Sequence, residues 1–512
     1  MSVLVLDVGT TSMRGILYAE DGQKLCVCQK PNHVVFGQNG TVSEPTADWR
    51  DNTTDIMRAI AEDPACNPEE IASIAITSQR SSIIPVDADG TPLTDTIMWQ
   101  DIRNKAICDE LAAHNELCFA KTGARVNTVF SGSKMTWVRT QAPEIYEKTA
   151  HFVNIPEYIN LLMSGEYCSD YTYASRSGLM NLRQKTWDEE MLELYRVEKE
   201  KLNRLIEPGQ ICGRVSAKFA AQTGLPAGIP IRHCGGDQQC AAVGLGVTKP
   251  GNVSVVLGTG GFLITACDQI PENLRSDVIC NCSGIAGKYV IEANVLACSA
   301  AYDWFIREFY GMQQIDYGYI EQQLSGLPGV TDALVIPYFK GRGVPDWNTA
   351  AKAAFLDVTL ATTRQELLKS LMESIFMELT NQLETFRQYV VPERIFASGG
   401  LTRSAALGRL LADVTGLPIA IRDDKESTAW GAYLIARTGM GDFASVDEAS
   451  RALGTEEAVC ILEPDESRHA QYELKRSRMN TYYQKLIETD LRFSQPALRR
   501  RPLQPHQGLR HL

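Results

Sequence analysis

Two stretches of the chain share one pattern of hydrophobic and polar positions. Residues 2–18 and residues 253–266 each read as an apolar run, a Gly/Thr turn and a second apolar run. Apolar runs separated by turn residues predict two β-strands joined as a hairpin. Because one hairpin opens each half of the chain, we expect an internal duplication, with two similar α/β halves facing one another across a cleft.

Predicted helices and strands alternate along the rest of the chain. Spaced apolar residues indicate amphipathic helices over 46–62 and 363–389. Short apolar runs indicate buried strands over 71–77 and 393–397. Helices that alternate with such strands are typical of the α/β class.

The length of 512 residues favours two large domains over a single core. Lys249-Pro250-Gly251 interrupts the pattern and is the expected hinge region. We therefore predict an N-terminal domain over 1–245 and a C-terminal domain over 246–490. Residues 491–512 have no periodicity and contain five arginines, which predicts a basic, disordered tail.

Composition narrows the classes of function. Hydrophobic content of 44%, charged content of 22% and a formal charge of −12 are those of a globular protein that is poorly suited to nucleic acid or an anionic membrane. No apolar run approaches the length of a membrane span. The 14 cysteines are scattered, with no C-x-x-C pair, so we expect reduced thiols and a cytoplasmic location.

The turn of the first hairpin offers hydroxyl groups and backbone N–H groups in one short stretch. Gly9, Thr10, Thr11 and Ser12 form a turn that can cradle phosphate oxygens, and Arg14 adds positive charge. Asp7 ends the first strand beside this turn, where a carboxylate is placed to hold Mg²⁺. A plain hairpin with a Ser/Thr turn explains the same residues equally well.

A second candidate site lies in the stretch His233-Cys-Gly-Gly-Asp-Gln-Gln-Cys-Ala-Ala242. A β-prone segment runs here into two glycines and then into small helix-forming residues, so backbone N–H groups and the helix dipole face outward. Asp237 at that position is expected to stay ionised and to accept a proton from a hydroxyl group. Taken alone, the stretch fits an N-cap aspartate better than a general base.

Polar groups also follow other predicted strands, where α/β proteins place binding residues. They include Arg80, Trp99, Gln100, Asp101 and Arg103, which suit a polyhydroxylated ligand but also fit surface charges beside a core tryptophan. The turn Ser398-Gly399-Gly400 can lie flat against an adenine or a ribose, although an ordinary βα turn has the same pattern.

Four motifs, in this order and at these spacings, resemble the FGGY carbohydrate kinases. They are Asp7-Val-Gly-Thr-Thr-Ser-Met-Arg14, Gly236-Asp-Gln-Gln239, Gly258-Thr-Gly260 and Gly399-Gly400. The resemblance runs to about residue 480 and is greatest to the glycerol kinases of that family. It implies an α/β, actin-like ATPase fold, in which two ribonuclease-H-like domains close over ATP and a sugar or polyol.

The resemblance also implies roles for residues at the matching positions. The residues it assigns to the ATP phosphates are Thr10, Thr11, Ser12 and Arg14, and those it assigns to the rest of the nucleotide are Thr259, Gly260, Gly400 and Ser404. The residues it assigns to the acceptor pocket are Arg80, Ser81, Trp99, Asp237, Gln238 and Phe262, with Asp237 as the catalytic base. The implied ligands are ATP, Mg²⁺ and a small hydroxylated substrate, with homodimer formation left open.

Two departures from the glycerol kinase pattern affect the expected substrate. Ser81 stands where those enzymes carry a glutamate that binds glycerol, and Val129 stands where they carry a tyrosine. Both changes enlarge the pocket and remove polar groups, which favours a four- or five-carbon polyol or ketose. The alternatives are a glycerol kinase proper, a pentulose or autoinducer kinase, a catalytically silent sugar-binding regulator and an actin-like ATPase.

Overall fold

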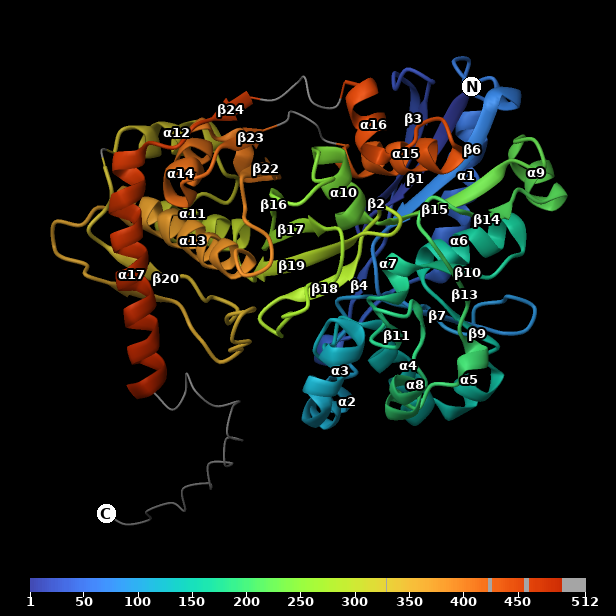
Figure 1. Ribbon diagram of the computed structural model, residues 1–512, viewed down its shortest axis with the longest axis horizontal. Helices are drawn as coiled ribbons and strands as arrows, with labels where there is room; N and C mark the ends of the chain where they lie inside the picture. The colour runs from blue at the N-terminus through green and yellow to red at the C-terminus, as the bar shows by residue number, and fades with distance from the viewer. Residues whose placement is uncertain (328, 422–425, 455–459, 490–512) are drawn as a thin grey trace, which may run out of the picture.

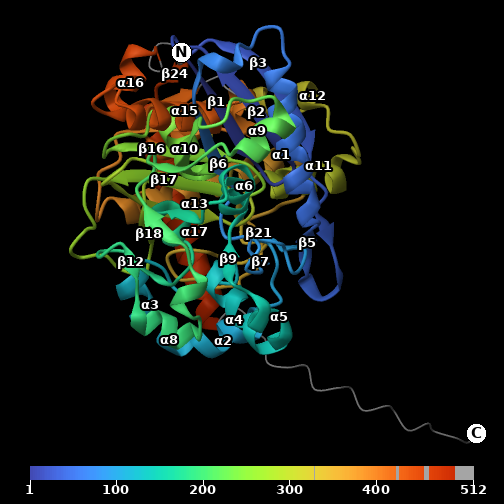
Figure 2. The same cartoon turned by 90° about the vertical axis from the view of Figure 1, so that its right-hand side faces the viewer.

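The computed structural model describes residues 1–327, 329–421, 426–454 and 460–489. The predicted tail over 491–512 lies outside the described residues. Figure 1 shows two mixed α/β bodies side by side, one built around each predicted hairpin, and Figure 2 views them with the N-terminal body toward the viewer. Across the described part of the chain, no helix combines the length and the apolar character that a membrane span requires.

Six strands of each sheet follow the same order, and this repetition agrees with the predicted duplication. In the first sheet the order across the sheet is β14 (Ile211–Arg214), β15 (Pro230–Gly236), β6 (Ile71–Ser78), β1 (Ser2–Val8), β2 (Ser12–Tyr18) and β3 (Lys24–Pro31). In the second it is β18 (Ile279–Cys282), β19 (Tyr289–Val295), β17 (Gly261–Cys267), β16 (Asn252–Leu257), β22 (Arg394–Ser398), β23 (Ile419–Ile421) and β24 (Cys460–Leu462). The two orders match when the first sheet is taken from β3 to β14 and the second from β19 to β24, with β18 as an additional edge strand. In both, the hairpin is antiparallel, and the first strand of the hairpin pairs in parallel with a later strand. Two such sheets define the actin-like arrangement of ribonuclease-H-like domains that the sequence predicts.

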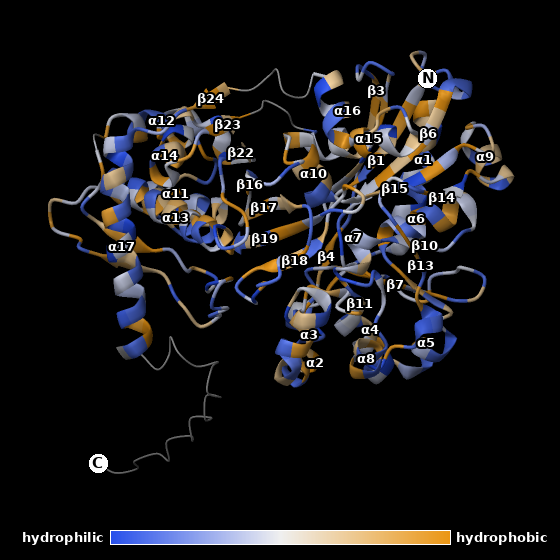
Figure 3. Ribbon diagram, in the orientation of Figure 1, coloured by the Kyte–Doolittle hydropathy of each residue, from blue (hydrophilic) through white to orange (hydrophobic). Residues whose placement is uncertain are grey.

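Alternation along β1 divides the N-terminal core between the two faces of its sheet. Leu4 and Leu6 pack with α1 (Thr46–Ala61) and α6 (Ile155–Ser164), whereas Val3 and Val5 pack with α10 (Asp237–Leu245) and α15 (Ser427–Met440). This is the period of two that a strand with both faces buried requires. Figure 3 shows the strands of both sheets toward the hydrophobic colours, while α17 (Glu466–Thr489) at the rim is largely hydrophilic.

The C-terminal sheet is covered in the same way, on one face by helices of its own half. The helices packed there are α11 (Ser299–Tyr310), α13 (Arg364–Phe386), α14 (Ala405–Thr415) and α17. On the other face, Ile264 and Val290 pack against Ala242 and Leu245 of α10. Helix α10 therefore lies between the two sheets, with α15 alongside it (Figure 1).

A smaller helical region hangs below the N-terminal sheet in Figure 1. Its helices are α2 (Lys105–Leu111), α3 (Asn115–Thr122), α4 (Ser131–Gln141), α5 (Pro143–Lys148) and α8 (Glu189–Tyr195). Its backbone reaches the C-terminal sheet, since the Cys280 N–H donates to the Gly123 carbonyl at 2.9 Å. This hydrogen bond links the helical region directly to the second sheet.

Candidate active site

Strand register brings three separate sequence motifs to one edge of the N-terminal sheet. Asp7 on β1 lies opposite Thr77 on β6, and Ser78 on β6 lies opposite Gly236 on β15. The carboxyl ends of these parallel strands therefore meet, and α/β proteins bind ligands at such an edge. Arg80 follows β6 and Asp237 follows β15, so both lie at this edge.

The turn of the first hairpin is tied to the same edge. The Gly9 N–H donates to the Ser12 carbonyl at 3.0 Å, which closes the turn between β1 and β2. The Gln79 side chain donates to the Gly9 carbonyl at 3.2 Å, and the Trp99 indole N–H donates to the Thr10 hydroxyl at 3.2 Å. The turn is thus fixed by residues of the acceptor motif rather than standing free.

Asp237 is the first residue of α10, and the N-cap position belongs to Gly236. The interpretation of Asp237 as a capping residue is therefore wrong. Its carboxylate accepts a hydrogen bond from the adjacent Gln238 N–H at 2.8 Å. Gly236 is needed for the passage of Arg80, because a Cβ at Gly236 would lie 2.4 Å from Arg80 Cδ.

The two aspartates at this edge are half-buried, and the charge of each acts on neighbouring ionisable groups. Burial raises the pKa of the Asp237 carboxyl, and the guanidinium groups of Arg80 and Arg176 oppose that increase. Burial also raises the pKa of Asp7 to about 7, with Arg14 opposing and the carboxylate of Asp237 contributing. Neighbouring carboxylates with raised pKa values are typical of sites that accept protons or cations.

Arg14 on β2 lies directly opposite Asp7 on β1 in the hairpin register. Its guanidinium also lies 4.0 Å from Glu426, which precedes α15 and comes from the second half of the chain. Thr10, Thr11 and Arg14 are thus grouped at one turn, as predicted, where the two halves meet.

The predicted acceptor residues differ in whether their polar groups already have protein partners. Arg80 is buried and forms an ion pair with Glu292 at 3.3 Å. Ser81 has a φ of 73°, and its buried hydroxyl has no hydrogen-bond partner among the described residues. The side-chain carbonyl of Gln238 is likewise buried without a partner in the described part of the chain. Phe262 on β17 is 38% exposed, an unusual position for a large aromatic ring.

Two other polar residues that follow the predicted strands have a structural role instead. The Asp101 carboxylate accepts from the Arg103 side chain at 2.9 Å and from the Val42 N–H at 2.6 Å. The Arg103 guanidinium stacks on Trp137, with 4.9 Å to the ring centroid. Both side chains therefore fasten the loop after β8 (Thr96–Ile97) through contacts with other protein groups.

The second hairpin turn is held by the start of α11. The Cys298 N–H donates to the Thr259 carbonyl and the Ser299 N–H to the Gly258 carbonyl, both at 2.9 Å. Gly260 is buried inside the turn, whereas Thr259 is exposed at its tip. A hydroxyl at the tip of a rigid turn is available to a ligand in the space between the sheets.

The Gly-Gly turn after β22 lies beside this hairpin. Gly399 has a φ of 103°, and a Cβ there would lie 2.5 Å from the Leu257 carbonyl oxygen, so only glycine fits. Gly400 has open space around its Cα. The Ser404 hydroxyl caps α14 and is also paired with Glu321. Gly400 thus presents a bare backbone surface, whereas Ser404 already has protein partners.

Sequence reasoning assigned no role to Glu292, the buried carboxylate that pairs with Arg80. It also lies 3.3 Å from Arg176 and accepts from Gln239 at 2.9 Å. A single acidic residue within the apolar run Tyr289-Val-Ile-Glu-Ala-Asn-Val is a signal that could have identified it, because charged residues are rarely buried unless paired.

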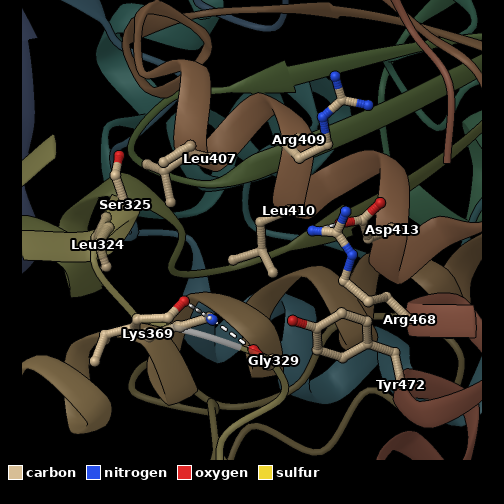
Figure 4. Close-up of a pocket in the computed structure, with 12 residues that line it drawn as sticks. Leu324, Ser325, Gly329, Lys369, Leu407, Arg409, Leu410, Asp413, Arg468 and Tyr472 are labelled. Carbon is tan, nitrogen blue, oxygen red and sulfur yellow. Dashed lines mark hydrogen bonds and ion pairs between the residues drawn. The ribbon is translucent and has the colours of Figure 1, made fainter. Parts of the chain in front are cut away.

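A separate cavity of about 200 Å³ lies between α12 (Tyr317–Ser325), α13, α14 and α17 (Figure 4). Its charged groups have protein partners: Lys369 donates to the Gly329 carbonyl at 2.5 Å, and Arg468 lies 3.0 Å from Asp413. These pairs stabilise the packing of the helices around the cavity, away from the edge that carries Asp7 and Asp237.

The structure thus has one mixed sheet in each half, a Gly/Thr hairpin turn in each sheet, and the half-buried Asp237 carboxylate at the edge of the first sheet. The chain matches the N-terminal domain of the FGGY family of carbohydrate kinases over residues 2–244 and the C-terminal domain of that family over residues 253–440. These matches cover most of the chain, which therefore belongs to the FGGY family of carbohydrate kinases. It is accordingly an ATP-dependent kinase that phosphorylates an alcohol group, as the sequence predicts.

Relatives and solved structures agree with this assignment. The chain is 29% identical to a glycerol kinase of Trichlorobacter lovleyi over 93% of this chain and 97% of that protein. It is 28% identical to glycerol kinase 2 of Thermotoga maritima over 87% and 91%. Its fold matches xylulose kinase from Lactobacillus acidophilus with a TM-score of 0.88 at 21% identity, over 95% of this chain and 99% of that one. It matches Plasmodium falciparum glycerol kinase with ADP with a TM-score of 0.84 at 23% identity, over 96% of this chain and 98% of that one.

Proposed function

We propose that this kinase phosphorylates a four- or five-carbon polyol or ketose in preference to glycerol. The observation that carries the proposal is the buried Ser81 hydroxyl, which has no partner among the described residues. The side-chain carbonyl of Gln238 is in the same state. Buried polar atoms need hydrogen-bond partners, and the hydroxyl groups of a longer acceptor would supply them.

Asp237 is the proposed general base. The acceptor hydroxyl gives its proton to the Asp237 carboxylate while its oxygen bonds to the γ-phosphorus of ATP and the bond to the β-phosphate oxygen breaks. Arg80, Trp99, Gln238 and Phe262 form the acceptor pocket in this proposal. Correct alignment inside a dry cleft then provides most of the acceleration, because phosphoryl transfer needs little covalent help from the protein.

The nucleotide is proposed to bind between the two hairpin turns. The residues proposed to contact its phosphates are Thr10, Thr11, Ser12 and Arg14, and those proposed for the rest of the nucleotide are Thr259, Gly260, Gly400 and Ser404. Contacts from both halves mean that closing the cleft assembles the site. The division at residue 245 remains a prediction, and α15 shows that the second part of the chain also packs on the first sheet.

Asp7 is the proposed holder of Mg²⁺. No three His, Cys, Asp or Glu side chains converge as a metal site within residues 1–327, 329–421, 426–454 and 460–489. Magnesium commonly binds one or two carboxylates together with substrate phosphates, and a buried carboxylate beside a phosphate turn fits that need. When bound, the cation would neutralise charge on the phosphates and on the Asp7–Asp237 pair.

A panel of acceptors in an ADP-release assay tests the proposed substrate class. Glycerol, erythritol, ribitol, ribulose and xylulose would be compared at saturating ATP. We expect kcat/KM for at least one four- or five-carbon compound to exceed that for glycerol by about tenfold or more. Glycerol is the alternative acceptor, supported by the names of the relatives, and a highest kcat/KM on glycerol would establish it. ADP release that needs no acceptor would instead favour the actin-like ATPase alternative.

Location and assembly complete the proposal. We infer a cytoplasmic enzyme, because its proposed substrates are ATP and a small carbohydrate and its thiols are predicted to be reduced. A homodimer remains a prediction, and light scattering on the purified protein would decide between one and two copies.

A further inference from the structure

Glu292 lies on β19 of the C-terminal sheet and carries the negative charge that pairs with Arg80 and Arg176. It lies between Ile291 and Ala293, whose side chains enter the core on the far face of that sheet. Alternation along the strand therefore turns Glu292 toward α10 and the N-terminal half. Its side chain is only 8% exposed, so its charge is compensated by protein groups and not by water.

Three hydrogen-bond donors and one further ion-pair partner surround the Glu292 carboxylate. Oε1 accepts from Gln239 at 2.9 Å, from Asn281 at 3.0 Å and from Arg80 at 3.3 Å, and Oε2 lies 3.3 Å from Arg176. Asn281 lies on the neighbouring strand β18, whereas the other three partners precede residue 245. Glu292 thus connects the two halves of the molecule through their buried polar groups.

The two arginines that pair with Glu292 also act electrostatically on Asp237. The pKa of Asp237 is raised by burial and lowered by Arg80 and Arg176, while the charge of Glu292 acts in the raising direction. Burial alone would raise the pKa of Glu292 too, but Arg176 and Arg80 more than offset it and keep that pKa low. Both carboxyl groups interact with the same two cations, which lower the pKa of Glu292 below its ordinary value, whereas the pKa of Asp237 stays raised.

Each arginine also has a second contact, away from Glu292, that restricts its orientation. Arg176 stacks on the ring of Phe130, with 5.0 Å from its guanidinium carbon to the ring centroid. Arg80 passes over Gly236, where a side chain would collide with its Cδ. These contacts restrict both arginine side chains, and the ion pairs with the Glu292 oxygens fix the positions of their guanidinium groups.

We propose that Glu292 is a positioning residue, supplied by the C-terminal half, which holds Arg80 and Arg176 off the Asp237 carboxylate and so keeps that base available to the acceptor. This inference rests on the proposed role of Asp237. Without Glu292, the buried Arg80 and the partly buried Arg176 would lack this counter-charge and would turn to Asp237, the carboxylate whose pKa they already lower. An ion pair there would remove the base from the acceptor hydroxyl.

The test compares Glu292→Gln, Glu292→Asp and the double variant Glu292→Gln/Arg176→Gln in the full chain. The acceptor is the compound with the highest wild-type kcat/KM in the panel. We expect Glu292→Gln to lower kcat by about 100-fold, the order caused by misplacing catalytic groups by an ångström, with the KM for ATP nearly unchanged. Glu292→Asp keeps the charge and should fall between the wild type and Glu292→Gln.

The double variant distinguishes positioning from simple loss of structure. Removing one surplus guanidinium should restore about tenfold of the lost kcat, because neighbouring charges couple strongly. A double variant as slow as Glu292→Gln or slower would overturn the proposal. So would a Glu292→Gln protein whose kcat per folded molecule equals that of the wild type, even with a lower melting temperature.

If Glu292→Gln does not fold, Glu292→Asp decides the matter. Its shorter side chain cannot reach both guanidinium groups, so the proposal requires a lower kcat at unchanged KM for ATP, and an unchanged kcat overturns it. Wild-type turnover of the chosen acceptor establishes the proposed function separately from these variants. Failure of the inference therefore leaves the kinase assignment intact.

Discussion

Gly244 and Gly431 bring helices α10 and α15 into backbone contact. A Cβ atom at Gly431 would lie 2.9 Å from the Gly244 nitrogen and 1.8 Å from the Cys240 carbonyl oxygen. A Cβ at Gly244 would lie 2.0 Å from the Ser427 carbonyl oxygen. These backbone atoms cannot move aside as side chains do, so the glycines determine how closely the second half of the chain docks on the first.

Gly431→Ala should therefore destabilise the protein although alanine is the better helix former. We expect a loss of about 3 kcal/mol or more in the free energy of unfolding, because overpacking against rigid backbone forces the helices apart. Chemical denaturation followed by circular dichroism measures it. Gly318→Ala in the exposed helix α12 is the matched control and should stabilise the protein by up to about 1 kcal/mol. Equal stability of Gly431→Ala and the wild type would show that the helices can separate without cost.

Asp237→Asn should abolish the base while keeping the shape of the site. We expect kcat to fall by about 10²–10⁴, the range for loss of a general base, with ATP and acceptor affinities retained. Steady-state kinetics and equilibrium binding of both ligands separate the two effects. Asp170→Asn is the control, since Asp170 is a fully buried aspartate that accepts from the Thr172 N–H as the N-cap of α7 (Tyr171–Ala174). A near-normal kcat for Asp237→Asn would refute the role of the base.

Asp7→Asn should weaken the response to magnesium more than the affinity for metal-free ATP. An amide cannot supply the anionic ligand that a divalent cation needs beside the phosphates. Calorimetric titration with ATP, with and without MgCl₂, measures the difference for wild type and variant. The same gain in affinity from Mg²⁺ in both proteins would mean that Asp7 is only a strand-end residue.

Ser81→Glu combined with Val129→Tyr should shift substrate preference toward glycerol. The glutamate and tyrosine restore polar groups that bind a three-carbon acceptor and fill space that a longer one would use. We expect the ratio of kcat/KM for glycerol to that for the best longer acceptor to rise by about tenfold or more. Each single variant serves as the control for additivity. No change in the ratio would show that these two positions do not select the substrate.

His233 should make the fold sensitive to mild acid. The ring is fully buried on β15, 3.3 Å from the Pro156 carbonyl, and burial lowers its pKa from 6.5 to about 4. Between these values the unfolded chain binds more protons than the folded one, so stability is lost as the pH falls from about 6.5 to 4.

His233→Gln should remove this part of the acid sensitivity. We expect the loss of unfolding free energy between pH 7 and pH 4.5 to shrink by about 2 kcal/mol relative to the wild type. His114→Gln, at an exposed position, should leave the pH profile unchanged. Parallel profiles for wild type and His233→Gln would show that the ring does not titrate during unfolding.

The local pattern of the sequence determined the elements and several of the site residues. The two hairpins, α1, α13 and the strand before Gly399-Gly400 form where apolar spacing and turn residues predict them, because those signals act over a few residues. Asp7, Arg80 and Asp237 could be named in advance because each is a charged residue at or within four residues of the end of an apolar run. Parallel strands then had to bring those ends together.

Only the tertiary structure decided which charges face one another. Asp101 and Arg103 look like binding residues in the sequence, but they pair with each other. Glu292 has no local signal beyond its apolar neighbours, and its importance depends on arginines more than 100 residues away across the boundary between the two sheets. Burial and pairing are properties of the packed chain, and so are the pKa values that follow from them.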